Sequence, residues 1–460
     1  MLVGMTEVPG PVSVRHRLMS GGLWAIGGRL AIALTALLSN ALLARILTPS
    51  DFGVYFLALS VVLTGATVGT LGLNQSVVRF VAESMGMNLP GRARRVVGLV
   101  FRMGIMGAVA VGGAYLLVGP VIARSLFHAP ALAAVSGLVA GWIVVLTLQT
   151  LQAETFRGFH DIKSATTFGG LVAGSLLTSC LLMLWLFGGR TGLSTVLVVT
   201  VACGLTSVTL GGLLLRSRVS SLPVGGVESR VRAAEIATVA WPIMIAGIAL
   251  AALLQADVWI VGAFRSQEEV AIYRAASQLA LMTILVTQVL YAVLPPLIVE
   301  KYTRGESESL QRLLRASATV TTVVVAPVLG AFVLMPGSIL NLVYGEYYRS
   351  GGWVLALISL GWFVNVATGM RGMVLLLTGH ERTQLMITLV AGSFNVILCG
   401  IGAVYWNIYG VAVGAMTAMI VQCLAELVFV RRRLGIWTHA SVASVSEIKK
   451  LTGAARAKLR

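Results

Sequence analysis

Residues 51–55 read DFGVY, and residues 269–273, 218 positions later, read EVAIY. The same shift carries the apolar runs between 96 and 215 onto further apolar runs in the second half of the chain. Two halves, about 11–228 and 229–446, would then hold six apolar runs each. Because six is even, both halves begin on the same side of a membrane. The sequence therefore predicts parallel repeats with a substrate site between them, near the midplane.

The composition places these runs in a lipid bilayer. Of 460 residues, 57% are hydrophobic and 11% are charged, less than half of the roughly 25% charged residues in a soluble domain. Apolar runs of about 20 residues recur along the chain, which is the length that crosses a bilayer as a helix. We expect an all-α polytopic membrane protein, not a soluble enzyme. The expected spans are 22–47, 52–77, 96–118, 130–151, 165–187, 193–215, 235–260, 270–298, 316–335, 352–377, 384–405 and 407–430.

The net charge of +17 is explained by topology. With both termini in the cytoplasm, the inner segments hold 25 of the 34 Lys and Arg residues and the outer loops hold five, as cytoplasmic loops do. The chain has no basic domain or recognition motif, so we expect no nucleic-acid partner. The predicted organisation is a cytoplasmic tail (1–20), an N-lobe (21–228), a C-lobe (229–433) and a basic cytoplasmic tail (434–460), with a central cavity between the lobes.

Arginines inside the spans are the main functional signal. An arginine at the bilayer centre costs at least about 2.5–3.5 kcal/mol, so it faces a wet cavity, has a partner or reaches an interface. Arg29 shares a helix face with Asn40 on the first span, and Arg274 shares one with Gln278 on the eighth. Asn74 adds a polar group to the second span. These stripes predict one cationic cavity wall that binds an anion; a structural pair or snorkelling is the alternative.

Two further charges lie near the inner ends of spans. Arg371 on the tenth span is a weaker candidate for the same cationic cavity. Glu426 on the twelfth span lies five residues before the arginine run at 431–433. An interfacial ion pair with that run is the simplest expectation for Glu426.

Asp257 is the acid without a neighbouring basic cluster, near the outer end of the seventh span. One interpretation is an ion pair with Arg265, Arg45 or Arg274. The other is a carboxylate that couples transport to H+ or Na+, because burial would raise its pKa toward the working range. The sequence leaves these two interpretations open.

Other chemistry has little support in the sequence. No Gly-rich loop ends in Lys-Ser or Lys-Thr, and no His or Cys residues have metal-ligand spacing, so we expect no P-loop, metal or cofactor. The four cysteines lie in apolar runs and are expected to behave as small hydrophobic residues. Amphipathic stretches at 300–316 and in the C-terminal tail are expected to rest on anionic lipid or to be solvated segments.

A family resemblance agrees with this interpretation. The stretch ARILTPSDFGVY at 44–55, then LGL at 71–73 and Arg79, resembles the bacterial polysaccharide and O-antigen flippases of the multidrug/oligosaccharidyl-lipid/polysaccharide exporter superfamily. In the second half, WP at 241–242 is followed in the family's order by Asp257, Gly262 and Tyr273. The resemblance covers roughly 20–430, nearly the whole chain.

The resemblance implies a MATE-like transporter of twelve helices in a bacterial cytoplasmic (inner) membrane. It would move an undecaprenyl-diphosphate-linked oligosaccharide from the inner to the outer leaflet by alternating access, for O-antigen, lipopolysaccharide, exopolysaccharide or capsule synthesis. Arg29 and Arg274 occupy helices whose cationic residues hold the pyrophosphate or acidic sugars in such proteins. Its expected partners are this glycan, membrane lipids, and a polysaccharide polymerase with glycosyltransferases.

Two other functions compete with this one. An ion-coupled multidrug exporter could share the fold. Organic cations would, however, meet one well-placed aspartate and four intramembrane arginines, Arg29, Arg102, Arg274 and Arg371, and like charge disfavours them. A membrane-embedded polysaccharide polymerase or ligase would be expected to carry catalytic residues in a sizeable outer loop. The longest outer loop, 336–351, has only Glu346 and Arg349 as charged residues.

Overall fold

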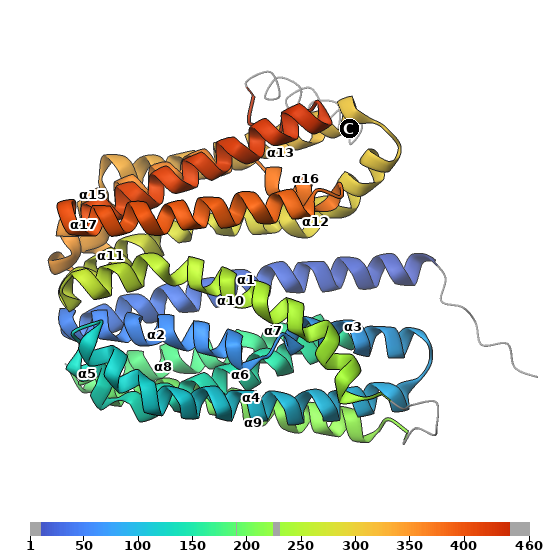
Figure 1. Cartoon of the computed structure of the whole chain (residues 1–460), viewed down its shortest axis with the longest axis horizontal. Coiled ribbons are helices and arrows are strands. Elements are labelled where there is room, and N and C mark those ends of the chain that lie inside the picture. Colours follow the sequence, from blue (N-terminus) through green and yellow to red (C-terminus); the bar gives the residue numbers. More distant parts are fainter. Residues whose placement is uncertain (1–10, 190, 224–230, 442–460) are drawn as a thin grey trace, which may run out of the picture.

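The computed structural model describes residues 11–189, 191–223 and 231–441, and every regular element within these ranges is a helix (Figure 1). The first half contains α1 (Pro11–Ile46), α2 (Pro49–Gly69), α3 (Leu73–Gly86), α4 (Pro90–Ser125), α5 (Pro130–Ala134), α6 (Ser136–Gly158), α7 (Ile162–Thr166), the π-helical turn η1 (Thr167–Leu171), α8 (Val172–Phe187) and α9 (Leu193–Ser220). The second half contains α10 (Ala233–Phe264), α11 (Gln267–Leu281), α12 (Ile284–Thr303), α13 (Ser307–Leu334), α14 (Pro336–Tyr344), the 3-10 helix η3 (Glu346–Gly351), α15 (Gly352–Ala367), α16 (Arg371–Leu377) and α17 (Glu381–Leu434).

The helices account for twelve membrane spans. Ten candidates among the described residues are long and apolar enough to cross a bilayer. One of them, α17, has non-helical backbone at Trp406 and Asn407, which divides its 54 residues into two spans. Helices α11 and α12, separated by residues 282–283, together cover the expected span 270–298. The expectation of an all-α, polytopic, twelve-span membrane protein is therefore confirmed.

The 218-residue repeat is visible where α2 and α11 begin. The hydroxyl of Thr48 caps α2 by accepting the N–H of Asp51 at 3.2 Å. Ser266, 218 residues later, caps α11 by accepting the N–H of Glu269 at 3.3 Å. Such caps satisfy backbone donors that a helix start leaves free. These two repeat-related helices also pack against each other, as expected if the axis relating the halves passes between them.

Figure 1 shows two helix bundles with α1 and α10 along the boundary between them. Helices α2–α9 form one bundle and α12–α17 form the other. Helix α10 packs against α2 and α3 on one side and α17 on the other. We keep the names N-lobe for α1–α9 and C-lobe for α10–α17. The predicted boundary between residues 228 and 229 lies outside the described residues.

The lobes meet closely at the end where α1 ends and α2 begins, which the predicted topology makes the outer end. The ring of Phe52 on α2 lies 5.5 Å from that of Tyr348 and 6.4 Å from that of Tyr344. Gly53 permits the close approach, because a Cβ there would lie 1.9 Å from the carbonyl oxygen of Gln267. Aromatic packing and helix contact therefore close the boundary between the lobes at this end.

The expected spans 52–77, 270–298 and 352–377 are each divided into two helices, a division that the apolar pattern of the sequence does not show. The interruptions lie at residues 70–72, 282–283 and 368–370. Gly72 and Gly369 have left-handed φ values of 73° and 74°, which end the preceding helical path. A Cβ on Gly72 would lie 2.1 Å from the carbonyl oxygen of Ala240, so α10 packs directly on the first break. Backbone groups freed at such breaks need partners inside the protein.

The segment at 300–316 does not form a separate helix on the lipid surface. Its second part belongs to α13, which continues without interruption into the ninth span. Leu310 and Leu314 are buried in a C-lobe cluster with Val374 and Val430, so they pack on protein in place of lipid. The first described residues of the predicted tail, 435–441, fold against the C-lobe. The amphipathic part of the tail lies outside the described residues.

Candidate functional site

Arg274 lies on α11 at the boundary between the lobes. Its guanidinium stands 5.1 Å from the centre of the Phe56 ring, which belongs to α2 of the N-lobe. The Nε atom is buried and has no hydrogen-bond partner among the described residues. A cation on an aromatic face gains about 0.5–2 kcal/mol, less than a hydrogen-bonded ion pair would supply. Arg274 is therefore held in place while part of its donor capacity stays unused.

Asp257 on α10 has a hydroxyl as its side-chain partner. Its Oδ2 accepts a hydrogen bond from the hydroxyl of Tyr273 at 2.9 Å. Arg45 donates to the carbonyl of Leu342 at 3.1 Å, and Arg265 donates to the carbonyl of Ala403 at 2.8 Å. Two of the three expected ion-pair partners of Asp257 are thus bound elsewhere.

The third expected partner of Asp257 is Arg274, on the adjacent helix α11. The structure records no salt bridge between the two in the described part of the chain. The recorded side-chain partner of Asp257 is therefore the hydroxyl of Tyr273. The role of Asp257 in ion coupling stays a prediction.

The other predicted cavity residues are spread over several helices. Arg29 is exposed on α1, and Asn40 is buried further along the same helix. Asn74 is half-buried on α3, and Gln278 is half-buried on α11, one turn after Arg274. Helices α1 and α11 line the boundary between the bundles in Figure 1. That these side chains form one cavity wall remains a prediction.

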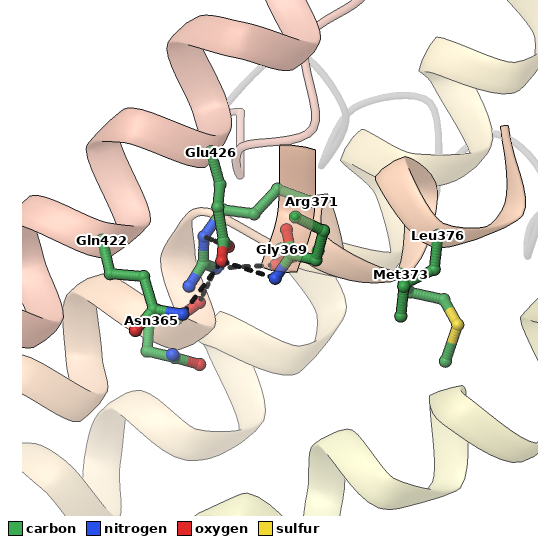
Figure 2. A pocket seen from close by; sticks show the side chains of 9 residues that line it. Asn365, Gly369, Arg371, Met373, Leu376, Gln422 and Glu426 are labelled. Carbon is green, nitrogen blue, oxygen red and sulfur yellow. Dashed lines mark hydrogen bonds and ion pairs between the residues drawn. The ribbon is translucent and has the colours of Figure 1, made fainter. Parts of the chain in front are cut away.

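Arg371 lies in a different environment, inside the C-lobe. It begins α16 directly after the break at 368–370, and it is 5% exposed. Its Nε lies 2.9 Å from Oε2 of Glu426, which is 2% exposed on α17. Figure 2 shows the two side chains pointing toward each other. Each buried charge therefore neutralises the other.

The remaining nitrogens of Arg371 also have partners. One terminal nitrogen donates to the carbonyl of Asn365 at 3.0 Å, to the hydroxyl of Thr368 at 2.7 Å and to the carbonyl of Gly369 at 2.9 Å. The other lies 2.7 Å from the sulfur of Cys423. Cys423 thus acts as a hydrogen-bond acceptor, beyond the small hydrophobic residue expected from the sequence. In this conformation each guanidinium nitrogen of Arg371 therefore contacts another residue of the C-lobe.

A polar cavity of about 240 Å³ adjoins the ion pair, lined by Arg371, Glu426 and neighbouring residues of α15–α17. Gln384 and Gln422 donate to Oε1 of Glu426 at 2.8 and 3.0 Å. The expectation that Glu426 pairs with the run at 431–433 is wrong, because Glu426 faces α16 while that run is exposed. The sequence contains a signal for the Arg371–Glu426 pair. Two opposite charges in apolar spans of the same half are costly to bury unless they form an ion pair.

Metal binding has no support in the described residues, among which no group of three His, Cys, Asp or Glu side chains could hold an ion. The expected H+ or Na+ coupling stays a prediction.

Comparisons with known proteins agree on family and fold. A family model described as "Polysaccharide biosynthesis protein" matches residues 18–302. No curated protein matches the chain. The fold is similar to a multidrug resistance MATE transporter of the MOP superfamily in its inward-facing conformation, with 14% identity, a TM-score of 0.74, and coverage of 89% of this chain and 98% of that one.

Two further solved structures have the same fold. The lipid II flippase MurJ in an inward closed conformation has 13% identity and a TM-score of 0.68, over 89% of this chain and 87% of that one. A MOP-superfamily transporter from Pyrococcus furiosus has 13% identity and a TM-score of 0.61, over 91% and 95%. That transporter is described as having a binding pocket of reverse polarity. At these identities the likeness concerns the fold.

Proposed function

The chain belongs to the polysaccharide biosynthesis protein family, and we propose that it flips an undecaprenyl-diphosphate-linked oligosaccharide from the inner to the outer leaflet. The protein would work in a bacterial inner membrane with both termini in the cytoplasm, as the distribution of basic residues favours. Its role is transport, and catalysis of glycan synthesis belongs to partner glycosyltransferases and a polymerase.

The observation that carries this proposal is the state of Arg274. It lies between the lobes, where parallel repeats place substrate, and its Nε has no hydrogen-bond partner among the described residues. A guanidinium presents donors in a planar fork that suits phosphate oxygens. The diphosphate of a lipid-linked glycan supplies such oxygens.

The remaining cavity residues would extend the contact. Arg29 supplies a second positive charge from α1, and Asn40, Asn74 and Gln278 supply amides that hydrogen-bond sugar hydroxyls or phosphate. Arg371 is left out of this contact set because Glu426 and four hydrogen bonds occupy its guanidinium. The closed outer end supports substrate binding from the inner leaflet as the first step of alternating access.

Transport in proteoliposomes tests the proposal. We expect Arg274→Gln and Arg29→Gln to lower flipping of a lipid-linked oligosaccharide by about tenfold or more, because a hydrogen bond to a charged group contributes about 1.5–3 kcal/mol. Arg124→Gln is the matched control, since it removes one positive charge at the exposed outer end of α4. Arg274→Lys should keep part of the activity. Native rates for both glutamine variants would refute the cavity assignment.

The same vesicles test ion coupling. An imposed H+ or Na+ gradient should drive net accumulation of substrate in one leaflet, and Asp257→Asn should abolish the dependence on the gradient. If substrate accumulation depends on neither gradient, Asp257 has no role in ion coupling. Replacing the glycan with an organic cation tests the alternative exporter function, which the nearby positive charge of Arg274 disfavours.

A further inference from the structure

The chain does not leave the C-lobe when α17 ends. Gly435 has a left-handed φ of 72° and ends the helix. The described residues that follow, 436–441, are not helical, yet Ile436 is 3% exposed and Thr438 is fully buried. We call residues 435–441 the C-terminal strap. Irregular backbone buried in a membrane lobe needs hydrogen-bond partners there.

The strap finds its partners at the break between α15 and α16. The hydroxyl of Thr438 donates to the carbonyl of Thr368 at 2.8 Å, and the N–H of Ala440 donates to the carbonyl of Ala367 at 2.7 Å. These two carbonyls lie where α15 ends, and the last carbonyls of a helix lack partners within it. The strap therefore satisfies acceptors that the broken span leaves free.

Further contacts hold the strap against other helices. The N–H of Trp437 donates to Oε1 of Gln311 at 2.8 Å, and the N–H of Ser441 donates to the hydroxyl of Thr319 at 3.0 Å, both on α13. Gly369 lies directly below the strap, because a Cβ there would be 2.4 Å from the carbonyl oxygen of Thr438. Helix α13 and the break thus hold the strap between them.

Arg371 meets the same break through its own hydrogen bonds. Its guanidinium binds the carbonyls of Asn365 and Gly369, and Glu426 of α17 binds its Nε. Helix α17 therefore reaches the break twice, once through Glu426 and once through the strap that continues from its end. Figure 2 shows Gly369, Arg371 and Glu426 gathered at this point.

We propose that the strap fixes the α15/α16 break and thereby positions Arg371, with Thr438 as the positioning residue. The strap makes the tenth span rigid despite its interruption, so that the C-lobe moves as one body. Without the strap, α16 shifts relative to α15, and the guanidinium leaves its partners. This proposal does not depend on the identity of the substrate.

Cys423 reports on the position of Arg371, because its buried sulfur lies 2.7 Å from the guanidinium. The experiment uses the full chain in proteoliposomes with Cys423 as its only cysteine, after Ala replaces Cys180, Cys203 and Cys399. The rate of labelling by a small water-soluble methanethiosulfonate is measured. Thr438→Val should raise this rate about three- to tenfold, as expected from the loss of one net hydrogen bond. Thr438→Ser keeps the hydroxyl and should label at the native rate.

Two matched controls distinguish loss of the strap contact from the effect of removing any hydroxyl or of replacing any left-handed glycine. Thr322→Val removes a half-buried hydroxyl that bonds within α13, to Ala318, and should leave the rate unchanged. Gly369→Ala should raise the rate more than Gly379→Ala, because both glycines have left-handed φ but a Cβ on Gly379 meets nothing within 4 Å.

A second reporter keeps the test falsifiable if a variant loosens the whole lobe. Cys399 is buried in the same lobe and is the only cysteine of a parallel protein in which Cys423 is Ser. Labelling of Cys399 should be unaffected by Thr438→Val. The proposal is overturned if Thr438→Val leaves the Cys423 rate native, if Thr438→Ser raises it equally, or if Cys399 accelerates to the same extent.

Discussion

The environments of Arg274 and Arg371 show two ways in which a membrane protein holds an arginine among apolar helices. Arg371 lies within one lobe, with a carboxylate and several hydrogen-bond acceptors around it. Arg274 lies between lobes, against the Phe56 ring, with a buried Nε that has no partner among the described residues. The first arrangement stabilises one lobe. The second leaves donors for a ligand that arrives at a moving boundary.

The largest expected difference is in stability. Arg371→Ala leaves Glu426 buried without its counter-charge, which should cost about 3–5 kcal/mol. Arg274→Ala loses one cation–π contact and should cost no more than about 2 kcal/mol. Thermal unfolding of the purified proteins in one detergent measures both.

A double variant tests the cause of that loss. Adding Glu426→Gln to Arg371→Ala removes the uncompensated charge and should restore part of the stability. Equal losses for the two single alanine variants would contradict the distinction between the two sites.

A substitution where α2 contacts α11 should alter the region around Arg274 and leave the region around Arg371 unchanged. A Cβ at Gly53 would meet the carbonyl oxygen of Gln267 at 1.9 Å, so Gly53→Ala should force α2 and α11 apart at a cost of about 1–3 kcal/mol. Cys399 is buried in the same hydrophobic cluster as Tyr273, the neighbour of Arg274, and reports on that side. Its labelling should accelerate about tenfold, while labelling of Cys423 stays constant.

Gly98→Ala is the control for that experiment, because a Cβ at Gly98 meets nothing within 4 Å. If Gly53→Ala accelerated both cysteines equally, the two arginine regions would belong to one cooperative unit, and the comparison between them would fail.

The smallest effect is expected for an ion pair outside the spans, between Asp161 and Arg218. Partial burial raises the pKa of Asp161, but hydrogen bonds from Ser164 and the charge of Arg218 outweigh it and lower the pKa below its usual value. A lowered pKa stabilises the fold above the ordinary Asp pKa of about 3.9 and loses this contribution as pH falls through the folded-state value.

Thermal unfolding of native protein and Asp161→Asn between pH 3 and 7 measures that contribution. The variant should be less stable near pH 7, by no more than about 1 kcal/mol, and the difference should shrink as the pH falls below about 4. A difference that grows in acid would reverse the assigned sign. A loss as large as that of Arg371→Ala would erase the contrast between exposed and buried ion pairs.

Some of these features could be predicted from the sequence because they repeat or follow hydropathy. The spans follow from apolar length, and the shift of 218 residues locates both helix caps, Thr48 and Ser266. The breaks at Gly72 and Gly369 could not be found this way, because 51 glycines occur and most of the described ones have no left-handed φ.

Long-range partners were the least predictable part of the site. The sequence pattern predicts that Glu426 pairs with the nearest basic run, whereas Glu426 binds Arg371, 55 residues away. The strap has the composition of an ordinary loop, GIWTHAS at 435–441. Its burial depends on where α13 and the break lie in space, which no local pattern encodes. The unused Nε of Arg274 likewise follows only from its neighbours in the fold.

The position of the strap in the sequence also determines when the C-lobe can finish folding during synthesis. Thr438 follows Gly369 by 69 residues. At roughly 5–20 residues per second, the ribosome adds this stretch in roughly 3–14 s. For most of that interval the tenth span is already synthesised. The carbonyls of Ala367 and Thr368 still lack the hydrogen-bond donors that Thr438 and Ala440 later supply. The C-lobe therefore completes its fold only after α17 has emerged, which makes residues 435–441 a late-formed part of its core.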